Sequence, residues 1–118
     1  MRPGTATLLA KADRAAAAAD AALAGGAPET AAGRAFYAML YAAKALLNER
    51  GLRLRTHQRI VAALAQVAAD RDPPLQAGLA TALARRRAGE TNELTYEEAG
   101  ALAERARQAV AAARRDIA

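Results

Sequence analysis

The sequence predicts an all-α fold, an up-and-down bundle of about five helices, and three observations favour it. Apolar residues recur every three or four positions through most of the 118 residues, as in amphipathic helices. No segment alternates apolar and polar residues with the β-branched enrichment of a strand. Short connections join the helical segments, which is typical of antiparallel neighbours in a bundle. The length corresponds to one domain, residues 1–118.

The first helix is expected to begin at a cap on Thr5 or Thr7 and to extend to about Leu23, where Gly25 and Gly26 end it. Its alanines leave a narrow apolar face. The residues expected to point inward are Leu8, Ala12, Ala15, Ala19 and Leu23.

The second helix is predicted from Pro28, which suits a first helical position, to Gly51, and it has two distinct faces. The apolar face consists of Phe36, Leu40, Ala43 and Leu47. A second arc, roughly 100° away, consists of Arg34, Tyr37, Tyr41, Lys44 and Asn48. Two of the three tyrosines of the chain lie there between cations, whereas a solvated face is normally built from Glu, Lys and Gln. This arc indicates a binding surface.

The remaining helices are predicted from their end signals. Thr56 is expected to cap a third helix with an apolar face at Ile60, Leu64 and Val67. The Asp-Pro-Pro segment at 72–74 separates it from a fourth helix, which ends at Gly89 and carries Leu75, Leu79 and Leu83. Thr95 and Glu98 form a capping box that starts the fifth helix. Its inward positions are Ala99, Leu102, Ala106, Val110, Ala113 and Ile117.

Composition excludes several kinds of site. The chain has no cysteine and one histidine, which excludes disulfides and thiolate metal sites and argues against a multi-histidine metal site, so we expect no metal and no cofactor. No apolar run approaches a membrane span and no signal peptide precedes the first helix, so a cytoplasmic protein with no membrane contact is expected. The net charge of +5 is compatible with an anionic partner.

His57 is the first candidate for acid/base chemistry, because only histidine has an ordinary pKa near neutrality. Four cations, Arg50, Arg53, Arg55 and Arg59, surround it in sequence and could hold a phosphate that is attacked with its help. The alternative is a histidine packed near a helix end. Residues 85–87 are three arginines that also have two possible roles. They either complement the carboxyl end of the fourth helix or bind phosphate.

The string Arg34-Ala-Phe-Tyr-Ala-Met-Leu-Tyr-Ala-Ala-Lys-Ala-Leu-Leu, followed by Gly51 and then Thr56-His57, resembles the HEPN domain family. Residues 8–13 and 94–99 are similar to the first and last helices of that family. The resemblance implies a HEPN-like helical bundle that forms homodimers and is encoded beside a minimal nucleotidyltransferase. In such toxin–antitoxin pairs the HEPN protein is often an RNA-cleaving toxin and the nucleotidyltransferase is its antitoxin.

The catalytic motif of that family is Arg-x(4–6)-His, which cleaves RNA without a metal. Arg50 and His57 satisfy the spacing, with six residues between them, although Gly51 follows the arginine where the family usually has a polar residue. No histidine follows residues 85–87. Other HEPN proteins lack the motif and act as binding modules.

Three hypotheses follow from the residues and the resemblance. The first is a binding module that contacts nucleotide, RNA or the nucleotidyltransferase through Arg34, Tyr37, Tyr41, Lys44, Arg55, Arg86 and Arg87. The second is a ribonuclease in which His57 is the acid/base and Arg50 or Arg55 stabilises the charged phosphorane. The third is a structural homodimer in which the face of Tyr37 and Tyr41 serves only as the interface between the two copies.

Overall fold

The computed structural model describes residues 1–68 and 94–117, and these residues form helices without a strand. The helices are α1 (Thr5–Ala24), α2 (Pro28–Glu49), α3 (His57–Ala68) and α5 (Tyr96–Ile117). The all-α prediction is therefore confirmed. The fourth helix predicted between residues 74 and 89 lies outside the described part of the chain, as does the burial of Leu64 and Val67.

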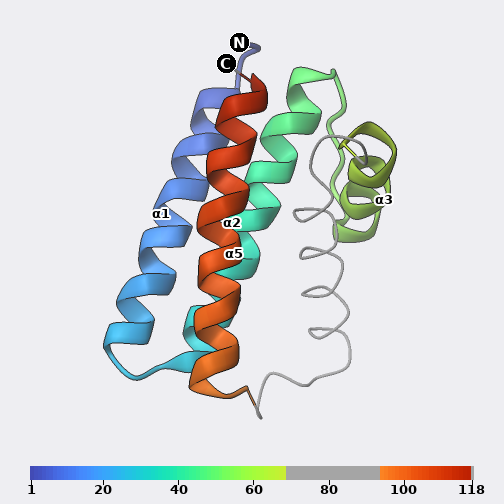
Figure 1. Cartoon of the computed structure of the whole chain (residues 1–118). Coiled ribbons are helices and arrows are strands. Elements are labelled where there is room, and N and C mark those ends of the chain that lie inside the picture. Colours follow the sequence, from blue (N-terminus) through green and yellow to red (C-terminus); the bar gives the residue numbers. More distant parts are fainter. Residues whose placement is uncertain (69–93, 118) are drawn as a thin grey trace.

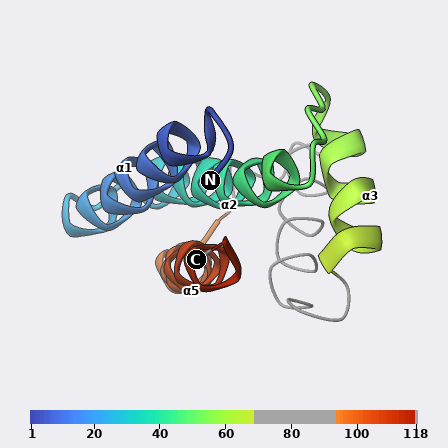
Figure 2. The same ribbon diagram turned by 90° about the horizontal axis from the view of Figure 1, so that it is seen from above.

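α2 is the central helix, because it contacts α1, α3 and α5. α1 runs antiparallel to α2 and α5, which run in the same direction (Figure 1). Viewed along the bundle, α3 lies beside α2 on the side away from α1 (Figure 2). This arrangement leaves the carboxyl end of α2 between the start of α1 and the connection to α3.

The core is built largely from alanine. The predicted apolar face of α2 is confirmed, since Phe36, Leu40, Ala43 and Leu47 are all buried. Small side chains let the helix axes approach closely, so few large residues are needed to fill the interior. The buried residues of α1 are Thr5, Leu9, Ala12, Ala15 and Ala19, and those of α5 are Ala99, Ala103, Ala106, Ala109, Val110 and Ala113.

Several predicted helix ends are confirmed. Thr95 and Glu98 form the capping box, with reciprocal hydrogen bonds of 3.1 Å between each backbone N–H and the other side chain. The Thr56 hydroxyl accepts a 3.2 Å hydrogen bond from the Arg59 N–H and so caps α3. Pro28 occupies the first turn of α2.

The expected caps at Thr5 and Thr7 were wrong. Gly4 occupies the N-cap of α1, and no side chain caps this end. The Thr5 hydroxyl is buried and instead bonds to α2. The inward position nearby is Leu9, which is buried, while Leu8 is only partly covered.

α2 ends two residues before the expected Gly51, for a reason visible in the backbone. The Gly51 N–H donates to the Asn48 carbonyl and the Leu52 N–H donates to the Leu47 carbonyl, which is the Schellman pattern. Gly51 has a φ of 79°, a left-handed conformation that glycine adopts without a Cβ clash. The chain therefore reverses here, and residues 51–56 return along α2 toward α3 (Figure 1).

Candidate functional site

A buried polar network fastens the start of α1 to the end of α2. The Asn48 amide donates to the Pro3 carbonyl at 3.0 Å and to the Thr5 hydroxyl at 2.8 Å. The Thr5 hydroxyl donates to the Glu49 carboxylate at 2.7 Å, and the Arg2 N–H donates to the same oxygen at 2.6 Å. Thr5 is 0% and Asn48 is 5% exposed. Asn48 therefore has a structural role, although the sequence placed it on the proposed binding face.

This network also changes the acidity of Glu49. The hydrogen bond from the Thr5 hydroxyl, followed by that from the Arg2 backbone, lowers the pKa of the Glu49 carboxyl. Because the pKa is lower in the folded state, the ionised carboxylate stabilises the fold above the unfolded-state pKa. That contribution is lost as the pH falls through the folded-state pKa.

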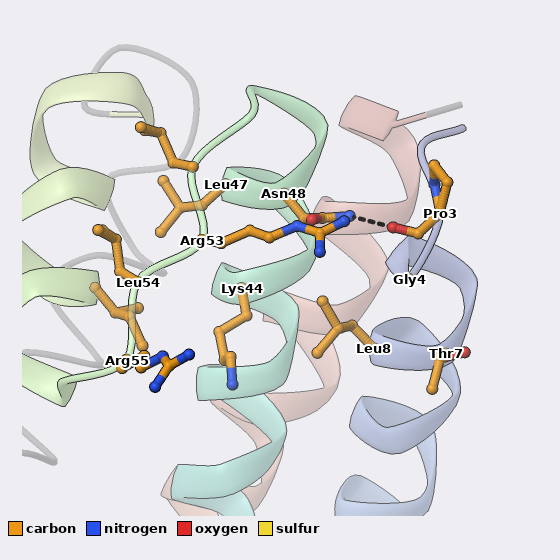
Figure 3. Close-up of a pocket in the computed structure, with 12 residues that line it drawn as sticks. Pro3, Gly4, Thr7, Leu8, Lys44, Leu47, Asn48, Arg53, Leu54 and Arg55 are labelled. Carbon is orange, nitrogen blue, oxygen red and sulfur yellow. Dashed lines mark hydrogen bonds between the residues drawn. The ribbon is translucent and has the colours of Figure 1, made fainter.

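A pocket of about 570 Å³ lies beside the network, between the start of α1, the last turns of α2, the connection and α3 (Figure 3). We call it the basic pocket. Its volume lies in the range of about 300–1,000 Å³ that is usual for small-molecule sites. Leucine and isoleucine side chains from all four segments supply its apolar lining: Leu8, Leu47, Leu52, Leu54 and Ile60.

Three cations line the basic pocket, Lys44 from α2 and Arg53 and Arg55 from the connection. In Figure 3, Arg53 extends from the connection across to Asn48 and Pro3, whereas the Arg55 guanidinium ends near the Lys44 ammonium, farther down α2. No aspartate or glutamate is among the described residues that line the pocket. Within the described part of the chain, none of the three cations forms an ion pair. The pocket therefore concentrates positive charge against an apolar wall.

The arginines of α5 are placed differently. Arg114 pairs with Asp13, and Arg107 pairs with both Asp20 and Glu104. Asp13 and Asp20 are the two acidic residues of α1. Both acidic groups of α1 thus pair with α5 and are not among the described residues that line the basic pocket.

The two tyrosines of α2 form an aromatic cluster on the turns of this helix that precede the basic pocket. Tyr37 and Tyr41 are partly buried, with ring centroids 6.1 Å apart. The His57 ring lies 6.3 Å from Tyr37 and 5.4 Å from Phe36. The Lys11 ammonium lies 5.8 Å from the centre of the Tyr41 ring. A base could stack on that face of Tyr41 only after Lys11 moved aside.

The structure does not bring the Arg50 and His57 of one chain together. The His57 ring packs on Phe36, which lies 14 positions before Arg50. At 1.5 Å per residue this is about 20 Å along α2, well beyond hydrogen-bond reach. A single chain therefore does not form the predicted catalytic pair.

The other predicted site residues fall into three groups. Lys44 and Arg55 line the basic pocket, and Arg34 is exposed near the start of α2. Arg86 and Arg87 lie outside the described residues. Arg53 was proposed only as a neighbour of His57, yet it lines the pocket. No sequence signal distinguished it from the other arginines around His57, since all four residues of the Leu-Arg-Leu-Arg stretch at 52–55 line the pocket.

Comparison with known proteins adds no relative. No family model matches the chain, and no curated protein or solved structure matches it. Among the described helices, none combines the length and the apolar character that crossing a bilayer requires. The described residues also contain no group of three or more His, Asp or Glu side chains able to hold a metal ion.

Proposed function

We propose that this chain is a cytoplasmic HEPN-type binding module of a toxin–antitoxin-like pair, and that it binds RNA or a nucleotide at the basic pocket and the adjoining face of α2. One observation supports this most strongly. Lys44, Arg53 and Arg55 line a pocket of nucleotide size, and no carboxylate is among its lining residues in the part of the chain that the structure describes. Such a charge distribution attracts phosphate, and the guanidinium groups can each donate two hydrogen bonds to it.

The apolar part of the pocket favours a nucleotide over a small inorganic anion. Leu8, Leu47 and Leu54 would cover the base or the sugar while the cations contact the phosphate. Tyr41 lies one turn before Lys44 on the same face of α2, so a longer RNA could continue from the pocket along this face. Arg34 would contact a phosphate farther along.

Binding is proposed in preference to cleavage because the described residues that line the basic pocket include no histidine, aspartate or glutamate. His57 is not among the residues that line the basic pocket, and its ring packs against Phe36 and Tyr37. General acid/base catalysis requires a group within hydrogen-bond reach of the reacting atoms.

The test is fluorescence anisotropy of a labelled single-stranded RNA of about 12 nucleotides, with the wild type and the triple variant K44Q/R53Q/R55Q. We expect the variant to bind at least about tenfold more weakly, with a shallower dependence of affinity on salt, because phosphate contacts release counterions. The matched control is R14Q/R105Q/R115Q, which removes the same charge from exposed positions outside the pocket. Circular dichroism checks that both variants fold.

Two results would overturn the proposal: a wild type without measurable RNA or nucleotide affinity, or equal losses in the two triple variants. In the first case, a protein that instead captures a nucleotidyltransferase or only its own copies would favour the partner-docking or homodimer alternatives. The same RNA is also run on a denaturing gel without metal. We expect it to remain intact, whereas cleavage that His57→Ala abolishes would favour the ribonuclease alternative.

A further inference from the structure

The charge in the basic pocket exceeds what one internal phosphate of an RNA chain would balance. A phosphodiester carries one negative charge, whereas a terminal phosphomonoester carries nearly two at neutral pH, because its second pKa is about 6. Lys44, Arg53 and Arg55 place three positive charges around one pocket, and none of them is paired with a described acidic side chain. The pocket is therefore better matched to a dianion than to a link in a polymer.

The three cations also differ in a way that suits a tetrahedral dianion. Lys44 is partly buried on a helix whose neighbouring residues Leu47 and Asn48 are buried, so its position is fixed by the core. Arg53 and Arg55 are exposed on the connection; Arg55 ends near Lys44, whereas Arg53 extends toward Asn48 and Pro3 (Figure 3). The point charge of Lys44 and the planar fork of Arg55 can contact several oxygens of one phosphate at once, while Arg53 adds positive charge at the Asn48 end of the pocket.

The size and the walls of the pocket limit what is attached to that phosphate. A volume of about 570 Å³ suits one small molecule. Leu47 and Ile60 are almost wholly buried at its wall, and Leu8 and Leu54 are partly covered beside them. A ligand with one doubly charged end and one flat, weakly polar end matches this division, and a terminal nucleotide has that form.

We infer that the basic pocket binds a nucleotide through its terminal phosphomonoester, either as a free mononucleotide or as the phosphorylated end of an RNA. This inference rests on the proposed function and makes it more specific. It assigns Lys44 and Arg55 to the terminal phosphate, with Arg53 adding to the positive charge of the pocket, and the leucine wall to the attached nucleoside.

The experiment compares two RNAs of about six nucleotides that differ only in a 5′-phosphate or a 5′-hydroxyl, together with AMP and adenosine as competitors. For the wild type we expect the phosphorylated RNA to bind about tenfold more tightly, and AMP but not adenosine to displace it. In R53Q/R55Q this preference should fall to about twofold or less. Arg34→Gln, an exposed position of α2 outside the pocket, should weaken both RNAs equally and keep the preference.

The outcomes separate this inference from the proposed function. If both RNAs bind equally well and lose affinity in K44Q/R53Q/R55Q, the inference is overturned while RNA binding stands. If the preference falls as much in R14Q/R105Q as in R53Q/R55Q, the added charge acts through the general field of the protein, which also overturns it. If neither RNA nor AMP binds, the proposed function fails with it. If displacement needs a lower concentration of AMP than of phosphorylated RNA, the ligand is the free nucleotide. If it needs a lower concentration of phosphorylated RNA, the ligand is the RNA end.

Discussion

Cationic side chains have opposite roles in two regions of the molecule. One region is the interface between α1 and α5, which we call the seam, and the other is the basic pocket. At the seam, Arg107 and Arg114 of α5 pair with Asp20 and Asp13 of α1, so these two charges are balanced across the interface. At the basic pocket, the cations of α2 and of the connection have no acidic partner within the described part of the chain. Both regions include residues of α1.

This difference distinguishes cations that are held in ion pairs from cations that are available to bind an anion. The carboxylates of α1 lie on the side that α5 covers, and Glu49 is held by Thr5 and Arg2. Paired surface arginines contribute modestly to stability, whereas unpaired cations grouped on one pocket contribute mainly to the attraction of anions. We therefore expect substitutions to separate the two regions, with effects on stability in one and on binding in the other.

The largest expected effect comes from the core that both regions share. Phe36→Ala should lower the free energy of unfolding by about 3–5 kcal/mol, because the ring is 2% exposed and its removal leaves a cavity. The variant also removes the contact to His57 at the start of α3. Urea denaturation followed by circular dichroism measures the change. Tyr96→Ala, at a position 52% exposed, is the control and should change stability by less than about 0.5 kcal/mol. A loss below about 1 kcal/mol in Phe36→Ala would contradict a shared core.

The next effect concerns the network that holds the wall of the basic pocket. Thr5→Val keeps the shape of a fully buried side chain but removes the donor to Glu49 and the acceptor for Asn48. We expect a loss of about 1–3 kcal/mol, since a buried polar group loses its partner. Thermal and urea unfolding measure it. Thr7→Val, an exposed position two residues later, is the matched control and should be nearly neutral. Equal stability of the two variants would show that the network is dispensable.

The sequence predicted most of the fold because the end signals of the helices are local. The capping box at Thr95, the cap at Thr56 and the glycines after α1 each act within a few residues, and all three were correct. The cap expected at Thr5 failed because its partner lies 44 positions away on α2. No local rule identifies a hydroxyl that bonds to a distant carboxylate.

The candidate site was only partly predictable for a similar reason. Helical spacing placed Tyr37, Tyr41 and Lys44 on one face, and the structure agrees. Spacing along the chain also suggested that Arg50 and His57 would meet, but the reversal at Gly51 sends the connection back along α2 and separates them. The path of a six-residue connection depends on what it packs against, which the sequence alone does not state.

The smallest expected effect on stability gives the sharpest test of the comparison between the two regions. Arg114→Gln removes an ion pair whose two side chains are about half exposed, so it should lower the free energy of unfolding by about 0.2–1 kcal/mol without changing RNA affinity. Arg53→Gln removes an exposed cation that forms no ion pair with the described residues, so it should leave stability unchanged and weaken RNA binding several-fold. Both variants lose one positive charge, so the general field of the protein changes equally. Urea unfolding and anisotropy on the same two proteins measure both quantities. If Arg114→Gln weakens RNA binding as much as Arg53→Gln does, the division between a structural seam and a binding pocket is wrong, and RNA responds only to net charge.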